Sequence, residues 1–454
     1  MTRRCSLSTD ATDGLFAPIF TGDELLRATD DQAWLQALLD VEAALAGAEA
    51  DAGIIPMTVA DVIIAFCTEG GAADRFDPGQ LGRAARPGGN PVIPLVEALT
   101  AALPPEARGW VHWGATSQDI LDTAAMLLSR RALGIIESEL GDLADGCAAL
   151  ADRYRTTLMA GRTLLQQALP ITFGLKAAGW LIGTLDARER VVGARSSLPI
   201  QLGGAAGTLA ALGPDGPAVA SRLASRLQLV EPLIPWHTSR QRVAELGATL
   251  GLVAGHAANI ATDVALLMQT EVAEAFEPAG PGRGGSSTLP HKRNPVAAAA
   301  TSAAARRAHA LIPVLFTGMV QEHERAVGGW QAEWETLTEL LRLAGGAAGR
   351  VRETVQGLEV DPNAMRDNLD RTDGLLMAER VTLALARHMD RSEARKGVQR
   401  AARSGTSFRT GLLADPAITS VLSADEVDRL LDPAGYLGAT STFIDRALQA
   451  HRGG

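Results

Sequence analysis

The sequence is poor in cysteine and lacks a basic excess. Its three cysteines, Cys5, Cys67 and Cys147, have no CxxC or CxxH spacing, which argues against a disulfide framework or a zinc site and fits a reducing compartment. The formal net charge of −10 leaves no general positive surface for nucleic acid. No apolar run approaches the roughly 20 residues that span a bilayer, and the N-terminus has no signal-peptide core. We expect a cytoplasmic protein with neither nucleic-acid nor membrane partners, in which any bound anion is small and meets a local basic cluster.

Aromatic residues are scarce as well, and no segment shows sustained alternation of apolar and polar residues. Aromatics make up 4% of the chain, whereas hydrophobic residues of all kinds make up 46%, enough for a large core. The abundance of alanine, leucine and arginine favours helices. In residues 31–53 a stripe at spacings of three and four, followed by glycine, predicts a helix with a C-terminal cap. The fold class is therefore all-α, with strands at most a minor part.

Five long segments with helical periodicity dominate the middle of the chain. Residues 54–115 contain seven prolines, which suits short helices and loops. Helices as long as the five that follow usually pack into a bundle or against copies of themselves. We divide the chain into an N-terminal helical domain (1–111), a central long-helix bundle (112–360) and a C-terminal helical domain (361–454). The five segments are 117–154, 172–196, 240–274, 295–321 and 330–356.

The stretch GGSSTLPHKRNP, residues 284–295, combines glycines, hydroxyls and basic side chains ahead of an alanine-rich helix. Asn294 is suited to cap that helix and Pro295 to begin it, while Lys292 and Arg293 add positive charge at the positive helix end, as a carboxylate site requires. The preceding glycine-rich residues 277–285 predict a mobile loop that carries Ser286 and Ser287. On composition alone, a solvated loop whose serines cap a turn is the commoner structure.

The same stretch resembles the signature GSSxMPxKxNP of the fumarase/aspartase superfamily, with Leu289 in place of methionine. Two further segments resemble the other regions of that superfamily: HWGATSQDILDT (112–123) and GRTLLQQALPITFG (161–174). The resemblance covers essentially the whole chain. It implies an all-helical, three-domain fold and a homotetramer whose active sites are shared between subunits. It also implies that Ser286 is the catalytic base and that Thr116 and Ser117 bind a substrate carboxylate.

One segment departs from the lyases of this superfamily. Adenylosuccinate lyases resemble GRTHGQHAEPTTFG there, with a histidine acting as general acid where this chain has Gln167. Leu164 replaces a second histidine and Leu169 a glutamate. Glutamine cannot donate a proton as an acid, but a carboxylate leaving group is already a stable anion and needs none. With PWHTSRQR (235–242) and DPAGYLG (432–438), this segment most resembles the bacterial 3-carboxy-cis,cis-muconate cycloisomerases of the β-ketoadipate pathway.

That resemblance implies intramolecular addition of a carboxylate to a conjugated double bond, with proton transfer through Ser286. A tricarboxylate substrate needs several cationic or donor groups. We expect no metal and no other cofactor, since no HExxH or similar spacing occurs. The candidate catalytic residues are Ser286, Lys292 and Gln167. The candidate substrate-binding residues are Asn90, His112, Thr116, Ser117, Gln118, Thr163, Gln166, Arg242, Ser287, Arg293, Asn294 and Arg325.

Alternatives remain for several residues and for the function. Thr116 or Ser117 could simply cap the helix that begins near residue 118, His112 could be a packed histidine, and Arg242 or Arg325 could form surface ion pairs. A fumarate-releasing adenylosuccinate or argininosuccinate lyase is the nearest other function. A non-catalytic structural protein of the lens-crystallin kind is the alternative of another class.

Overall fold

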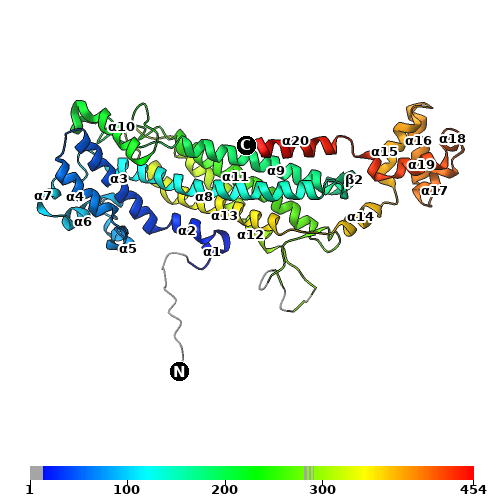
Figure 1. The fold of residues 1–454 in the computed structure, drawn as a ribbon, viewed down its shortest axis with the longest axis horizontal. Coiled ribbons are helices and arrows are strands. Elements are labelled where there is room, and N and C mark those ends of the chain that lie inside the picture. Colours follow the sequence, from blue (N-terminus) through cyan, green and yellow to red (C-terminus); the bar gives the residue numbers. More distant parts are fainter. Residues whose placement is uncertain (1–13, 281–283, 286–287, 290, 454) are drawn as a thin grey trace, which may run out of the picture. The chain divides into compact units, whose positions relative to one another are not determined.

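The computed structural model describes residues 14–280, 284–285, 288–289 and 291–453, and this part of the chain is mostly helical (Figure 1). The prediction of a helical fold is confirmed, with two small two-stranded sheets added. The chain separates into two compact units. Unit 1 comprises Met1–Gly141, Asp186–Asn259 and Ala299–Val351, and unit 2 comprises Asp142–Leu185, Ile260–Ala298 and Arg352–Gly454. The division into three domains stays a prediction.

The five long helices occur where the periodicity predicts them. The apolar stripe predicted on α11, from Leu246 to Leu267, is buried throughout. One prediction about α11 is wrong, because the helix ends at Leu267 rather than at residue 274. Ala273 has a φ of 52°, which a right-handed helix cannot contain, and a short strand begins at Ala275. The five are α8 (Ser117–Arg153), α9 (Phe173–Ser196), α11 (Gln241–Leu267), α12 (Val296–Thr317) and α13 (Gly329–Gln356).

Among the described residues, α11 alone is long and apolar enough to cross a membrane by composition. Half of its most apolar window is buried inside the fold, as is typical of a core helix in a protein of this size. Its small residues allow close packing. An added Cβ at Gly247 would lie 2.6 Å from the side chain of Leu315, so glycine lets α11 and α12 approach there.

The helices before α8 form part of unit 1, together with α10 (Gly216–Leu227) and the 3₁₀ turns η1 (Ala73–Arg75) and η2 (Ala210–Asp215). The predicted helix at 31–53 is α3, whose N-terminus is capped by Asp30 through a 2.7 Å bond from the Ala33 amide. Leu38, Val41 and Leu45 of its apolar stripe are buried. The seven helices are α1 (Ala17–Phe20), α2 (Asp23–Ala28), α3 (Asp31–Asp51), α4 (Met57–Thr68), α5 (Pro78–Ala84), α6 (Val92–Ala102) and α7 (Pro105–Arg108).

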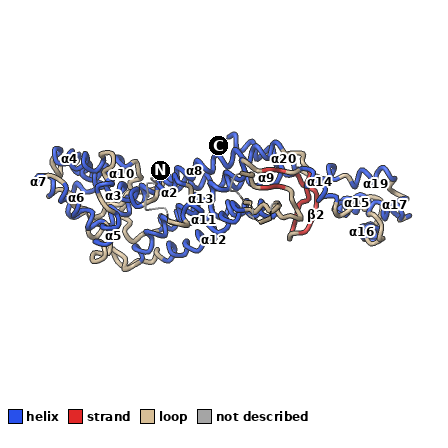
Figure 2. The backbone as a smooth tube through the Cα atoms, turned by 90° about the horizontal axis from the view of Figure 1, so that it is seen from below, coloured by secondary structure: helices blue, strands red, loops and turns tan. Residues whose placement is uncertain are grey.

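A β-hairpin in unit 2 was not predicted. Strands β1 (Leu158–Thr163) and β2 (Gln166–Thr172) pair antiparallel and are drawn in red in Figure 2. The two residues between them, Leu164 and Leu165, have φ values of 52° and 65°. Asn-Gly is the usual sequence for such a turn, so two leucines gave no hairpin signal. The left-handed region costs leucine about 1–2 kcal/mol per residue, which the surrounding structure must offset.

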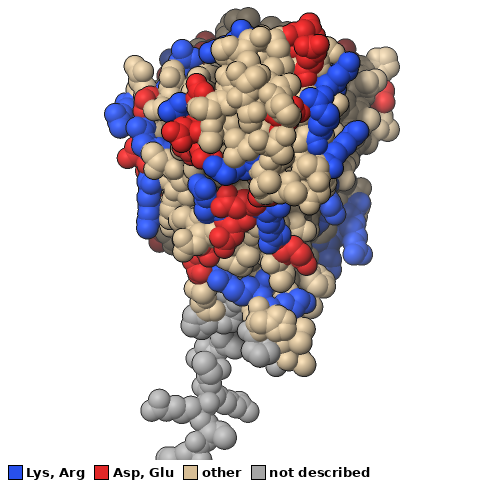
Figure 3. Space-filling model, turned by 90° about the vertical axis from the view of Figure 1, so that its right-hand side faces the viewer, with Lys and Arg blue, Asp and Glu red and all other residues tan. Residues whose placement is uncertain are grey.

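The C-terminal helices also belong to unit 2 and have a core of their own, which includes Val381, Leu385, Phe408 and Leu412. Aspartates and serines cap many of them, as Asp361 does at α14 and as Ser423 does with Glu426 at α19. Basic and acidic side chains are interspersed on the face drawn in Figure 3. The elements are β3 (Ala275–Phe276), β4 (Glu359–Val360), α14 (Pro362–Asp370), η3 (Leu375–Met377), α15 (Ala378–Leu385), α16 (Arg391–Ala402), α17 (Phe408–Ala414), α18 (Pro416–Thr419), α19 (Ala424–Leu431), η4 (Pro433–Tyr436) and α20 (Thr440–Gly453).

Candidate active site

In unit 1 the predicted carboxylate-binding motif is organised by a buried aspartate, Asp119, in the first turn of α8. Its carboxylate accepts hydrogen bonds from the backbone amides of Thr116, Gly203 and Gly204 at 2.9–3.0 Å. It also contacts Nε2 of His237 at 2.7 Å, and the residue is fully buried. Four partners satisfy a carboxylate that would otherwise be costly to bury. Asp119 thereby holds the start of α8, where Thr116 and Ser117 lie half-buried.

Gln118 lies beside this centre and its amide is already fully engaged. Its nitrogen donates to the carbonyl of His237 at 2.9 Å and to Asp122 at 3.1 Å, and its oxygen accepts from Nε of Arg325 at 3.1 Å. The structure thus brings the predicted residues Gln118 and Arg325 together. It gives Gln118 a structural role in the start of α8, and its predicted contact with substrate stays a prediction.

His112 precedes the motif and pairs with a buried glutamate. Nδ1 of His112 lies 2.7 Å from Oε1 of Glu42, and the histidine has a φ of 58°. Burial opposes protonation of the imidazole, but the charge of Glu42 and their hydrogen bond outweigh it and, with the charge of Asp119, raise the pKa of His112 above its ordinary value. The imidazolium form is therefore favoured, as suits a group that faces carboxylates.

The other predicted residues of unit 1 lie apart from Asp119. Asn90 accepts from the amide of Val92 at 3.1 Å and so supports the start of α6. Arg242 is exposed on the first turn of α11. Two residues earlier, Arg240 is the buried cation of the SRQR sequence, bonded to Asp122 at 2.7 Å and paired with Glu333. No local pattern distinguishes Arg240 from Arg242, because both arginines belong to the same SRQR sequence, and the role predicted for Arg242 stays a prediction.

In unit 2 the hairpin carries Thr163, Gln166 and Gln167. Thr163 and Gln166 are exposed cross-strand partners beside the Leu164–Leu165 turn. Gln167 is half-buried, and its side-chain nitrogen donates to the backbone carbonyl of Asn368 at 2.8 Å. Its side-chain oxygen is buried without a hydrogen-bond partner in the part of the chain that the structure describes.

The signature loop is closed at its two ends. The backbone amide and the side-chain nitrogen of Asn294 both donate to the carbonyl of Gly284, at 2.8 and 3.1 Å. Gly284 has a φ of 63°, and an added Cβ would lie 2.6 Å from the Asn294 carbonyl oxygen, so only glycine fits. Ser286 and Ser287, the predicted base and its neighbour, lie outside the described residues.

Arg293 ties the same loop end to the segment before it. Its guanidinium donates to Glu359 at 2.9 Å and to the carbonyl of Glu277 at 2.7 Å, and it lies over the ring of Phe276. The hydrogen bond from Arg293, with one from the amide of Ala279, lowers the pKa of Glu359 below its ordinary value. Lys292 is exposed, and no ion pair of its ammonium group is found among the described residues.

The cap of α12 differs from the prediction. Asn294 does not cap the helix. Instead the carboxylate of Glu277 accepts from the amides of Ala297 and Ala298 at 3.0 and 2.8 Å. An internal carboxylate thus occupies the positive helix end that the sequence suggested for a substrate anion. Glu277 lies 20 residues before these amides, so no local pattern could reveal it.

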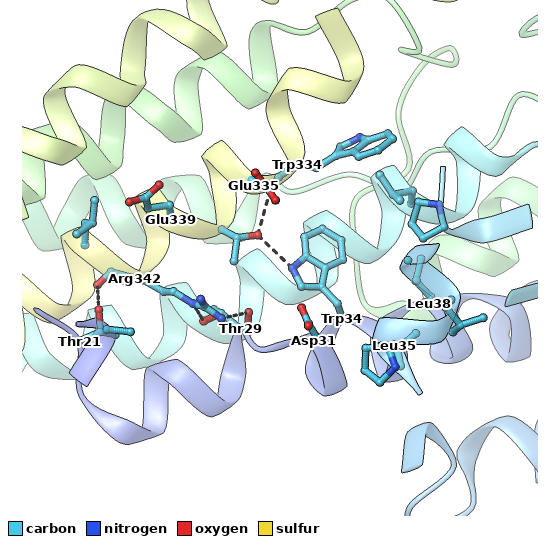
Figure 4. A pocket seen from close by; sticks show the side chains of 18 of the residues that line it. Thr21, Thr29, Asp31, Trp34, Leu35, Leu38, Trp334, Glu335, Glu339 and Arg342 are labelled. Atoms are coloured by element: carbon cyan, nitrogen blue, oxygen red, sulfur yellow. Dashed lines mark hydrogen bonds between the residues drawn. The ribbon is translucent and has the colours of Figure 1, made fainter. Parts of the chain in front are cut away.

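Unit 1 also contains a cavity of about 640 Å³ that includes none of the predicted site residues (Figure 4). Trp34 donates to Thr338 at 3.1 Å, and Arg342 donates to Thr29 at 2.8 Å, on the side of the cavity where Asp31 and Glu335 also lie. The opposite part is lined by apolar side chains such as Leu35 and Leu38.

The predicted residues are divided between the two units. Unit 1 holds Asn90, His112, Thr116, Ser117, Gln118, Arg242 and Arg325, and unit 2 holds Thr163, Gln166, Gln167, Lys292, Arg293 and Asn294. The predicted site did not include the residues that hold these side chains and their loop in place, namely Asp119, His237, Glu277, Glu274 and Asn368. Among these residues, only Asp119 lies at a position that the sequence marks, the first turn of a predicted helix.

Known proteins are similar to this chain in sequence and in fold. Residues 19–309 match a family model described as Lyase, and residues 374–447 match one described as Adenylosuccinate lyase C-terminus. The 3-carboxy-cis,cis-muconate cycloisomerase of Bradyrhizobium diazoefficiens is 47% identical over 97% of this chain and 98% of its own. The nitrosuccinate lyase of Streptomyces davaonensis is 43% identical over 96% and 94%. The crystal structure of 3-carboxy-cis,cis-muconate lactonizing enzyme from Pseudomonas putida has a TM-score of 0.90 at 43% identity, over 96% of this chain and 99% of that chain.

Proposed function

The chain belongs to the lyase family of the fumarase/aspartase superfamily, and we propose that it interconverts 3-carboxy-cis,cis-muconate and 4-carboxymuconolactone. One observation carries this proposal. The hairpin has Leu164 and Gln167 where adenylosuccinate lyases have histidines. Neither side chain can donate a proton as an acid, and Gln167 already donates to Asn368. Opening the lactone expels a carboxylate, which needs no proton, so this site suits that reaction.

In the muconate direction, a carboxylate oxygen of the substrate forms a bond to one carbon of the conjugated double bond. The other carbon, next to a second carboxylate, takes the hydroxyl proton of Ser286, and Ser286 regains a proton from solvent, so that one proton is taken up overall. The anionic intermediate between these steps needs preorganised positive charge. Lys292 supplies it, since its ammonium group is exposed and has no ion pair among the described residues. Thr116 and Ser117, at the start of α8, bind another carboxylate of the substrate.

The proposal includes the homotetramer that the family resemblance implies. Long helices such as the apolar α11 and the amphipathic α13 can pack against copies of themselves in another subunit. Sedimentation equilibrium of the purified protein at several concentrations would measure the mass of the assembly. A monomer at all concentrations would contradict this part of the proposal.

A second candidate rests on the same observation. A lyase that acts on nitrosuccinate, as the Streptomyces davaonensis relative is named, would also expel a stable anion, nitrite, and would need no general acid. Adenylosuccinate and argininosuccinate lyases, in contrast, release nitrogen leaving groups that must be protonated. The hairpin therefore disfavours the latter two.

The test is an absorbance assay of purified protein with 3-carboxymuconate, nitrosuccinate, adenylosuccinate and argininosuccinate in parallel. We expect consumption of 3-carboxymuconate, and turnover of nitrosuccinate alone would replace the proposal with the second candidate. Ser286→Ala should lower kcat by at least about 100-fold without changing the assembly, because it removes the proton-transfer group. Near-normal activity of this variant would show that another group moves the proton.

A further inference from the structure

The amide of Gln167 has a defined orientation in the structure. The backbone carbonyl of Asn368 can only accept a hydrogen bond, so the atom of Gln167 that lies 2.8 Å from it must be the nitrogen. The oxygen consequently faces the other way, buried and without a partner among the described residues. A buried carbonyl left unpaired costs about 1–3 kcal/mol, so this oxygen is suited to a donor supplied from elsewhere.

Asn368, in α14, is held in place through its side chain. Its nitrogen donates to Oε1 of Glu274 at 2.8 Å and to the carbonyl of Val272 at 2.7 Å, and the residue is 3% exposed. These side-chain contacts fix Asn368, and they therefore also fix its backbone carbonyl, to which Gln167 donates a hydrogen bond.

Glu274 is fully buried and is paired with Arg162 on β1. The guanidinium makes two parallel bonds to the carboxylate, at 2.8 and 2.6 Å. A bidentate arginine and the amide of Asn368 together compensate for the burial of this charge. Loss of any one partner would leave the carboxylate or the guanidinium under-satisfied.

These contacts form a closed circuit on the hairpin. Arg162 and Gln167 are register partners across β1 and β2, so the path Gln167–Asn368–Glu274–Arg162 returns to the pair from which it starts. Beyond this pair lie Leu164 and Leu165, both in the left-handed region and 97% and 73% exposed. A strained turn persists only when the surrounding structure holds it, and the circuit provides that support.

We propose that Arg162, Glu274 and Asn368 are positioning residues that orient Gln167 as a hydrogen-bond acceptor in the active site. An amide oxygen repels a substrate carboxylate and binds an N–H or O–H donor. In the assembled site, Gln167 orders an ammonium or hydroxyl group of the protein and does not hold the substrate anion. This inference rests on the proposed function, because it places the hairpin in the cycloisomerase site.

The first test is Glu274→Gln, which keeps the shape of the side chain but removes its charge. We expect kcat for 3-carboxymuconate to fall about tenfold or more with KM changed less than about threefold, because the circuit sets geometry without touching substrate. The matched control is Asp428→Asn, an acid-to-amide change at the exposed Arg409–Asp428 pair of the same unit. The control should keep the wild-type kcat.

The second test is the pH profile of Gln167→Glu. A protonated carboxyl can donate to the Asn368 carbonyl with one oxygen and keep the other oxygen as an acceptor. An ionised carboxylate would instead repel that carbonyl. We expect this variant to be most active at low pH and to lose kcat as the introduced carboxyl ionises, with no such loss in the wild type or in Asp428→Asn. A wild-type profile, together with an unchanged kcat in Glu274→Gln, would overturn the proposal.

The proposed role of Arg162, Glu274 and Asn368 can fail independently of the proposed reaction. If the wild type converts only nitrosuccinate, the function proposal fails, and the same variants are compared on that substrate. Hydrogen exchange over residues 158–172 needs no substrate at all. It should increase in Glu274→Gln and not in Asp428→Asn, and unchanged exchange would contradict the circuit whatever the reaction is.

Discussion

The two groups of predicted site residues are supported in different ways. In unit 1 the start of α8 is organised from inside by Asp119, a fully buried carboxylate with four partners. In unit 2 the signature loop is held at its ends, where Asn294 bonds Gly284 and Arg293 bonds Glu359. Lys292 lies exposed beyond these contacts.

The difference shows two ways of preparing a site for anions. In unit 1 the protein satisfies the buried Asp119 carboxylate in advance with four partners, which gives a rigid frame for Thr116 and Ser117. The loop ends instead rely on the Asn294–Gly284 hydrogen bonds and the exposed Arg293–Glu359 pair, next to the Glu277 cap of α12, and these contribute less individually. Variants at the two places should therefore lower the free energy of unfolding by different amounts.

Asp119→Ala should have the largest effect on stability. It removes the acceptor of three backbone amides and of His237, and we expect unfolding to become easier by about 3 kcal/mol or more. Urea denaturation would measure the loss. Asp61→Ala, at an exposed aspartate of α4, is the control and should change stability by less than about 0.5 kcal/mol. Equal losses in both variants would contradict the central role of Asp119.

Glu277→Ala should have an intermediate effect. The amides of Ala297 and Ala298 would lose their cap, at an expected cost of about 1–2 kcal/mol. The exposed Glu271, changed to alanine, is the matched control. If Asn294 were able to take over the cap, the loss in Glu277→Ala would be no larger than in the control.

The His112–Glu42 pair predicts a pH-dependent contribution to stability. Because the pKa of His112 is raised, the pair stabilises the fold fully below the unfolded histidine pKa of about 6.5, and this contribution is lost as pH rises through the raised value. The loss of stability that His112→Gln causes, relative to the wild type, should therefore be larger at about pH 5.5 than at about pH 9. A difference that is equal at both pH values would show that His112 does not titrate as proposed.

Arg293→Lys should have the smallest effect. Lysine cannot reach Glu359 and the Glu277 carbonyl together, but the pair is exposed, so the loss should stay below about 1 kcal/mol and shrink with added salt. Denaturation at low and high ionic strength would measure it. A loss as large as that of Asp119→Ala would show that the end of the loop is held as firmly as the start of α8.

The sequence predicted elements whose signals are local. The five long helices lie close to their predicted ranges, because apolar periodicity and proline placement act within a few turns. The hairpin at 158–172 was missed because Leu164 and Leu165 are not turn residues by type. The end of α11 was missed because Ala273 adopts a positive φ that alanine rarely favours.

Of the candidate site, the sequence alone was enough for the motifs and the family, and it carries the prediction that Leu164 and Gln167 leave no general acid. The groups that hold these residues became visible only in the folded chain. Glu277 caps α12 in place of Asn294, and Glu274 joins Arg162 to Asn368 across 112 and 94 positions of the chain. The physical reason is that helix periodicity is written into neighbouring residues, whereas a buried carboxylate takes its partners from whatever segments the fold brings to it.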